Sequence, residues 1–141
     1  MSVLDAIGNT PLVELERLNP NPRVRLLAKL EGSNPGGSVK DRIALEMVRD
    51  GLDRGALRPG KTILEATSGN TGIGLAMVGA ALGFPVKLAM PECVSFERRR
   101  TLEAFGAELV LTEGCLGTDG AIRMAERIFA ADPDAYFLPD Q

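Results

Sequence analysis

Residues 62–83 read TILEATSGNTGIGLAMVGAALG and combine an apolar run, a polar glycine loop and a run of small residues. The apolar residues 62–66 predict a strand, and residues 71–82 predict a helix that Gly83 ends. Residues 67–72 then form a loop at the carboxyl end of a strand, where open α/β sheets bind ligands. The helix start favours an anion, because its free N–H groups and the helix dipole are positive there. A well-capped turn without a ligand is the alternative interpretation.

The same alternation continues on both sides of this unit. Before it, residues 38–54 predict a helix in which Ser38 is the N-cap, Asp41 completes a capping box, and Gly55 follows the last turn. After it, strands at 86–90, 107–112 and 136–138 alternate with helices that begin at Ser95 and at Thr118 or Asp119. Strands joined by helices predict parallel pairing with right-handed crossovers. The predicted fold class is α/β, a three-layer α/β/α sandwich with a parallel sheet.

Residues 1–37 have a different character from the rest of the chain. They contain three turn-forming stretches, GNTP (8–11), NPNP (19–22) and NPGG (34–37), with short strand candidates at 12–15 and 25–30. The pattern predicts strands and turns that pack against something outside this segment. We therefore divide the chain into a strand-and-turn segment, 1–37, and an α/β domain, 38–141.

Composition excludes several classes of function. The 141 residues include no histidine, which excludes Ser-His-Asp catalysis and histidine-ligated metal sites, and two cysteines cannot form a four-cysteine zinc site. We therefore expect no metal. A net charge of −3 with 4% aromatic residues argues against nucleic-acid binding. The N-terminus resembles no signal peptide and no apolar run is long enough to span a membrane, so we expect a cytoplasmic protein without a membrane partner.

Lys40 is the second candidate for chemistry after the glycine loop. It lies in the first turn of the helix predicted at 38–54, where the helix dipole disfavours a cation. From its position alone, a solvated surface lysine is the simpler interpretation. If the amine is partly buried, the helix end and Arg42 would lower its pKa and make it a better nucleophile. An activated lysine in a chain without histidine suggests a Schiff base.

Three stretches together resemble the cysteine synthase family, pyridoxal-phosphate enzymes of the tryptophan synthase β fold type: GNTPL (8–12), NPGGSVKDR (34–42) and EATSGNTG (65–72). The resemblance covers the whole chain, and it implies the N-terminal portion of that fold. It implies that Lys40 attaches pyridoxal 5′-phosphate covalently and that Asn70 hydrogen-bonds the ring hydroxyl oxygen of the cofactor. The carboxylate of an amino-acid substrate would then be held by Thr67, Ser68, Thr71 and Gln141.

The implied reaction is a β-replacement that forms L-cysteine from O-acetylserine, or a similarly activated serine, and a sulfur donor. The resemblance also implies a homodimer, and residues 95–99 and 139–141 look more like the B-type enzymes. Two alternatives stay open: cystathionine β-synthase-like replacement, and a non-catalytic α/β module that binds an anion. Family members are about twice as long, so we expect an N-terminal part in which residues 1–37 belong to a larger domain. Alone, this part would be inactive.

Overall fold

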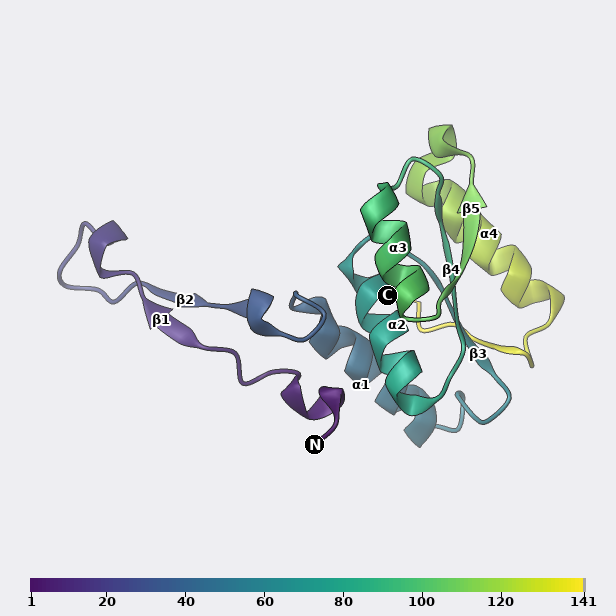
Figure 1. The fold of residues 1–141 in the computed structure, drawn as a ribbon, viewed down its shortest axis with the longest axis horizontal. Helices are drawn as coiled ribbons and strands as arrows, with labels where there is room; N and C mark the ends of the chain where they lie inside the picture. Colours follow the sequence, from purple (N-terminus) through teal and green to yellow (C-terminus); the bar gives the residue numbers. More distant parts are fainter. Residues whose placement is uncertain (141) are drawn as a thin grey trace.

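A parallel four-stranded sheet forms the centre of the protein in the computed structural model, which describes residues 1–140 (Figure 1). The strand order is β5-β4-β3-β6, with β3 (Thr62–Ala66), β4 (Val86–Pro91), β5 (Glu108–Thr112) and β6 (Tyr136–Phe137). Every neighbouring pair is parallel; Ile63 lies opposite Val86, and Leu88 lies opposite Leu109. The predicted parallel sheet is confirmed.

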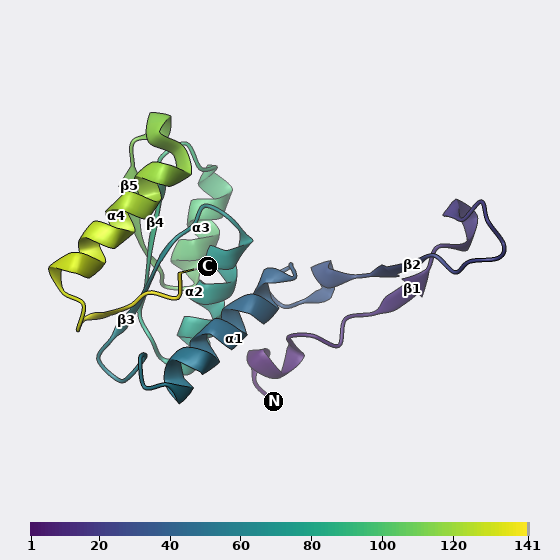
Figure 2. The ribbon, with the colours of Figure 1, turned by 180° about the vertical axis from the view of Figure 1, so that it is seen from behind.

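Helices cover both faces of this sheet (Figures 1 and 2). α1 (Lys40–Asp53), α2 (Asn70–Leu82) and α3 (Phe96–Ala104) lie on one face, and α4 (Gly117–Ala131) lies on the other. Successive strand residues point to opposite faces of the sheet. Ile63 therefore packs on the side of α1, α2 and α3, and Leu64 packs on the side of α4. The three-layer architecture is confirmed, and it explains why the strands are apolar on both sides.

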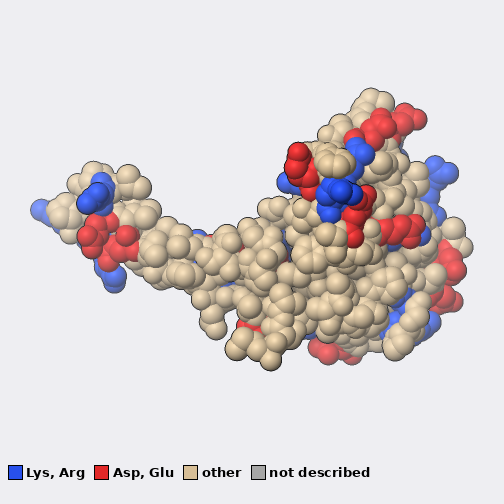
Figure 3. All heavy atoms as spheres, viewed as in Figure 1, with Lys and Arg blue, Asp and Glu red and all other residues tan. Residues whose placement is uncertain are grey.

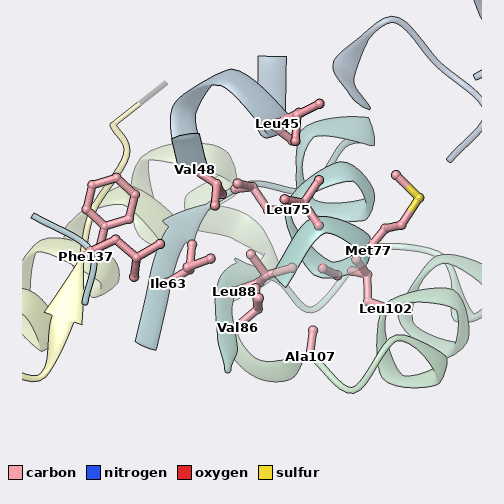
Figure 4. Packing of buried hydrophobic residues seen from close by; sticks show 14 of the residues in the cluster. Leu45, Val48, Ile63, Leu75, Met77, Val86, Leu88, Leu102, Ala107 and Phe137 are labelled. Carbon is pink, nitrogen blue, oxygen red and sulfur yellow. The ribbon is translucent and has the colours of Figure 1, made fainter. Parts of the chain in front are cut away.

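The larger core lies between the sheet and helices α1, α2 and α3 (Figure 4). Its members are buried apolar side chains of the sheet and of the three helices on this face, among them Val48, Ile63, Leu75, Leu88, Leu102 and Phe137. The smaller core is formed by Leu64 and Ala89 of the sheet with Ala121 and Ala125 of α4. Helices cover both faces of the sheet, so the loops at the carboxyl ends of the strands are the expected place for a ligand-binding site.

An antiparallel hairpin of β1 (Leu12–Glu14) and β2 (Leu27–Lys29) projects from the α/β body, and we call residues 11–30 the arm (Figures 1 and 2). The two strands lie within the predicted segments and are shorter. Charged side chains gather at the tip of the arm, and its middle is mostly uncharged on the face shown in Figure 3. Leu12 and Leu18 of the arm are 59% and 72% exposed.

The predicted capping box at the start of α1 is wrong. Ser38 Oγ accepts from the backbone N–H of Lys40 at 3.2 Å, whereas the Asp41 carboxylate does not return to Ser38. Asp41 Oδ2 accepts instead from the N–H of Gly36 at 2.6 Å. The turn before the helix brings Gly36 close to this carboxylate, and a Cβ at Gly36 would collide with it. The carboxylate therefore fastens the preceding loop rather than the N-cap.

Two other helix boundaries agree with the prediction. Gly55 follows α1 with φ of +69°, a conformation that glycine adopts without strain. Ser95 is the N-cap of α3, and its Oγ accepts from the N–H of Arg98 at 3.4 Å. Within residues 1–140, none of the helices combines the length and apolar character that crossing a membrane requires.

Candidate functional site

The first turns of α1 and α2 lie against each other. Gly74 follows Asn70 by about one helical turn, and a Cβ at Gly74 would lie 2.9 Å from Ala44 Cβ and 3.2 Å from the carbonyl oxygen of Lys40. The absence of a side chain at Gly74 therefore permits the close approach of the two helices. Lys40 is half-buried at this junction. The fold thus brings Lys40 and the start of α2, which are far apart in the sequence, to one place.

The loop before α2 keeps the features of an anion site. Gly69 is the N-cap of α2 and has no side chain with which to cap the helix, and a helix start of this kind favours an anion. A Cβ on Gly69 would meet no described atom within 4 Å, which shows open space beside the loop. Asn70 is exposed, Ser68 is half-buried, and Thr71 is 4% exposed.

Thr67 has a structural hydrogen bond within this loop. Its Oγ1 accepts from the N–H of Gly69 at 3.2 Å, and its own N–H donates to the carbonyl of Ala89 at 3.0 Å. The first bond fixes the turn that leads into α2, and the second ties the loop to β4. A hydroxyl whose oxygen already accepts a bond can still donate its proton to a carboxylate. Thr67 can therefore shape the loop and contact a ligand at once.

Arg98 of α3 contacts the same loop, which the sequence did not predict. Its Nη1 donates to the backbone carbonyl of Ser68 in a short hydrogen bond. Ser68, Ser95, Arg98 and Thr118 also line a hollow of about 390 Å³. Arg98 belongs to the charged run 97–100, a pattern typical of a solvated helix face. No local pattern could have identified this contact, because loop and helix are joined only by the tertiary fold.

Charged side chains surround the start of α1. Asp41 is fully buried, and burial raises the pKa of its carboxyl group above the ordinary value, although the N–H of Gly36 partly offsets this. Arg42 pairs with Glu31, with Nε and Oε2 2.8 Å apart. This pairing offsets the charge of Arg42, on which the expected effect on Lys40 partly depended. Residues two apart on a helix also face different directions.

The remaining predictions for the site can be placed as follows. Gln141 lies outside the described residues. In the part of the chain that the structure describes, no group of three or more His, Cys, Asp or Glu side chains is placed to hold a metal ion. Cys93 and Cys115 are both free and exposed. The chemistry of the site thus centres on one amine, one carboxamide and several hydroxyl and N–H donors.

Comparison with known proteins identifies the family. The sequence pattern described as "Pyridoxal-phosphate dependent enzyme" matches residues 3–141, almost the whole chain. The chain belongs to this family. The matched region contains both helix starts and the loop between β3 and α2, so the site described above lies inside the family's own framework.

Several members of the family are close to this chain in sequence and structure. A cysteine synthase of Aquifex aeolicus is 52% identical over 143 residues, covering 99% of this chain and 44% of that protein. Cysteine synthase A of Escherichia coli K12 is 53% identical over 135 residues, covering 96% and 41%. The crystal structure of a cysteine synthase (OASS) from Entamoeba histolytica matches with a TM-score of 0.92 and 46% identity, covering 97% and 42%. The chain therefore spans less than half the length of these relatives.

The cofactor of the family is pyridoxal 5′-phosphate, and the residues present fit it. An aldehyde needs a primary amine to bind covalently, and Lys40 is half-buried where α1 meets α2. A ring hydroxyl needs a hydrogen-bonding side chain, and the Asn70 carboxamide is exposed at the neighbouring helix start. The open space beside Gly69 leaves room for a ligand next to the loop.

Proposed function

We propose that this chain provides the lysine and the substrate loop of a pyridoxal-phosphate-dependent cysteine synthase. The reaction would replace the acetyl ester of O-acetylserine, or a similar leaving group, by a sulfur donor to form L-cysteine. The observation that carries the proposal is the close approach of Gly74 to the backbone of Lys40, which brings the start of α1 against α2. The similarity to cysteine synthases along almost the whole chain supports it.

Each residue of the site has a separate task in this proposal. Lys40 holds the cofactor covalently, and its Nζ, once released, takes the proton from the α-carbon of the substrate. Asn70 hydrogen-bonds the ring hydroxyl oxygen. Hydroxyl and N–H donors of Thr67, Ser68 and Thr71 bind the substrate carboxylate, and Gln141 is proposed to join them. When bound, pyridoxal 5′-phosphate supplies an electron sink for the charge left at the α-carbon.

Orientation is the main contribution of the protein. In the proposal, the start of α2 holds the substrate carboxylate, and the amine of Lys40 at the start of α1 acts on the α-carbon. Such positioning of reacting groups lowers the barrier substantially, and a misplacement of about 1 Å can cost on the order of a hundredfold in rate. The close approach at Gly74 is the feature that makes this placement reproducible.

The surroundings of the site are also part of the proposal. We propose that residues 1–37 belong to a larger domain and residues 38–141 to a smaller one, so that the exposed apolar side chains of the arm are covered in the assembled enzyme. We further propose a cytoplasmic homodimer that acts on small molecules and not on nucleic acid. The net charge of −3 and the few aromatic residues support the last point.

The test is Lys40→Ala in the full-length protein, compared with Lys61→Ala. Lys61 precedes β3 at the opposite end from the loop, and its Nζ donates to the carbonyl of Tyr136 at 2.9 Å. We expect Lys40→Ala to abolish both the yellow colour of bound cofactor and the formation of cysteine from O-acetylserine and sulfide. Lys61→Ala should keep both. Near wild-type turnover by Lys40→Ala would show that the proposal is wrong.

The same assay separates the alternative functions. Replacing sulfide by homocysteine measures cystathionine formation, and we expect sulfide to be strongly preferred. A wild-type protein that binds the amino acid but neither cofactor nor sulfur donor would instead support a non-catalytic anion-binding module.

A further inference from the structure

A cluster of polar side chains lies at the base of the arm, next to the helix that carries Lys40. We call it the polar junction. It consists of the backbone N–H of Gly8 and the side chains of Thr10, Glu31, Asn34 and Arg42, which come from three segments of the chain. The arm leaves the body after Thr10 and returns before Glu31, so this cluster is where the arm meets α1. The family resemblance and the proposed reaction leave Glu31 without a role.

Glu31 is the centre of the junction, because both of its carboxylate oxygens accept two hydrogen bonds. Oε1 accepts from Thr10 Oγ1 at 2.7 Å and from Arg42 Nη2 at 3.0 Å. Oε2 accepts from Asn34 Nδ2 at 2.9 Å and from Arg42 Nε at 2.8 Å. The Arg42 contact is bidentate, a geometry that restricts orientation as well as distance. One side chain thus holds together the segment before the arm, the segment after it, and α1.

The partners of Glu31 are themselves held in place. Thr10 and Asn34 are 5% and 3% exposed. Asn34 Oδ1 accepts from the N–H of Gly8 at 2.9 Å, and Thr10 Oγ1 also accepts from Arg42 Nη2 at 3.3 Å. Buried, fully bonded polar groups of this kind allow few alternative arrangements. The junction is therefore a rigid point at the base of an otherwise exposed arm.

Between this rigid point and Lys40 lies a loop that would not be rigid alone. Residues 34–39 read NPGGSV, and Gly37 has φ of +84°. Asn34 is fixed by Glu31 at one end of the loop, and at the other end the Asp41 carboxylate accepts from Gly36. Arg42, two residues after Lys40, is bound by the same Glu31. Glu31 consequently fixes the chain on both sides of Lys40.

We infer that Glu31 is a positioning residue that sets the first turn of α1, and with it the amine of Lys40, for bonding to the cofactor. Glu31 acts through Arg42 and Asn34 and does not itself touch the reacting atoms. The inference rests on the proposed role of Lys40. It extends that role by linking the polar junction at the base of the arm to the reactivity of Lys40.

The experiment measures how fast Lys40 is trapped by pyridoxal 5′-phosphate in the full-length protein stripped of cofactor. The amine and the aldehyde condense with loss of water, borohydride reduces the C=N bond, and mass spectrometry identifies the labelled peptide. In parallel, pyridoxine 5′-phosphate, which has no aldehyde, reports non-covalent binding. A residue that only stabilises the fold would alter both readouts together, whereas a positioning residue alters the first.

We expect Glu31→Gln to slow the labelling of Lys40 by about tenfold to a hundredfold, with binding of pyridoxine 5′-phosphate within about threefold of wild type. The matched control is Glu14→Gln, which removes the same charge from the exposed Glu14–Arg25 pair farther along the arm. This control should leave both readouts unchanged. Wild-type labelling by Glu31→Gln would overturn the inference.

A milder pair of variants keeps the test decisive if Glu31→Gln does not fold. Thr10→Val removes one hydroxyl from the junction, whereas Thr10→Ser retains it. We expect slower labelling in Thr10→Val and near wild-type labelling in Thr10→Ser, and equal rates in the two would contradict the inference. A wild-type protein labelled at lysines other than Lys40 would overturn the proposed role of Lys40 as well. Wild-type labelling at Lys40 with no effect of the variants would overturn this inference alone.

Discussion

The backbone of Lys40 lies directly against Gly74, and a Cβ added at Gly74 would be 3.2 Å from the Lys40 carbonyl oxygen. Lys40 begins α1, and Gly74 is in the first turns of α2, so this contact determines how near the lysine lies to the loop before α2. A carbonyl oxygen in a helix cannot move aside as the end of a flexible side chain can. The spacing between the starts of α1 and α2 is therefore sensitive to a single methyl group.

We predict that Gly74→Ala lowers the free energy of unfolding by about 1–3 kcal/mol, as overpacking of a close contact typically does. It should also slow cysteine formation, because α1 must move away from α2. Gly32→Ala is the control, since a Cβ there would meet no described atom within 4 Å. Urea unfolding and steady-state rates measure the two effects. An equally stable and active Gly74→Ala protein would show that the contact does not set the site.

The substrate loop provides a second prediction. Ser68→Ala should weaken binding of the amino-acid substrate by about tenfold to a hundredfold, the typical value for one lost hydrogen bond to a charged group. Binding of the cofactor should change little. Thr67→Ala should have a larger overall effect, because Thr67 Oγ1 also accepts from Gly69. Ser33→Ala, at an exposed serine, is the control. If Ser68→Ala weakened the binding of cofactor and of substrate equally, the cofactor phosphate would lie at this loop instead.

The polar junction predicts a pH dependence of stability. Hydrogen bonds from Arg42 and then Thr10 lower the pKa of Glu31 to about 2 from the ordinary value of 4.5, against the opposing effect of burial. Because the folded-state pKa is the lower one, this stabilisation is present above pH 4.5 and is lost as the pH falls toward 2. Glu31→Gln should thus be less stable than wild type at pH 7. The difference should shrink between pH 4.5 and 2.

Urea midpoints at several pH values measure this difference. In Glu14→Gln, which removes an exposed ion pair, we expect a smaller change at every pH. A stability difference between wild type and Glu31→Gln that does not change with pH would contradict the proposed contribution of the ionised Glu31 carboxylate.

The last prediction concerns residues 1–141 expressed by themselves. We expect them not to retain pyridoxal 5′-phosphate through gel filtration and not to form cysteine. Lys40 and Asn70 account for the aldehyde and the ring oxygen, whereas the longer relatives contain more than twice this length of chain. The exposed Leu12 and Leu18 of the arm should also promote association. A stoichiometric absorbance band that depends on Lys40, together with cysteine formation, would show that this prediction is wrong.

The layered α/β architecture could be predicted from the sequence because its signals are local. The apolar run at β3, the glycine loop after it and the terminating Gly83 lie within 22 residues, and each favours one backbone state independently of distant parts. The same holds for Ser95 as the cap of α3 and for Gly55 after α1. The loop 67–72 stands out by its residue types and its place after a strand, whereas the role of Lys40 comes from the resemblance to cysteine synthases.

The contacts that make these candidates a site were decided by the tertiary structure alone. The Asp41 carboxylate accepts from Gly36 and not from Ser38, because the preceding turn folds back onto it. Glu31 meets Arg42, and Ser68 meets Arg98, only after segments distant in sequence are packed together. A polar side chain has several possible hydrogen-bonding partners, and the local sequence does not show which of them it will meet. The packing of helices and loops selects one arrangement, since backbone and side chains in a dense core cannot be displaced independently.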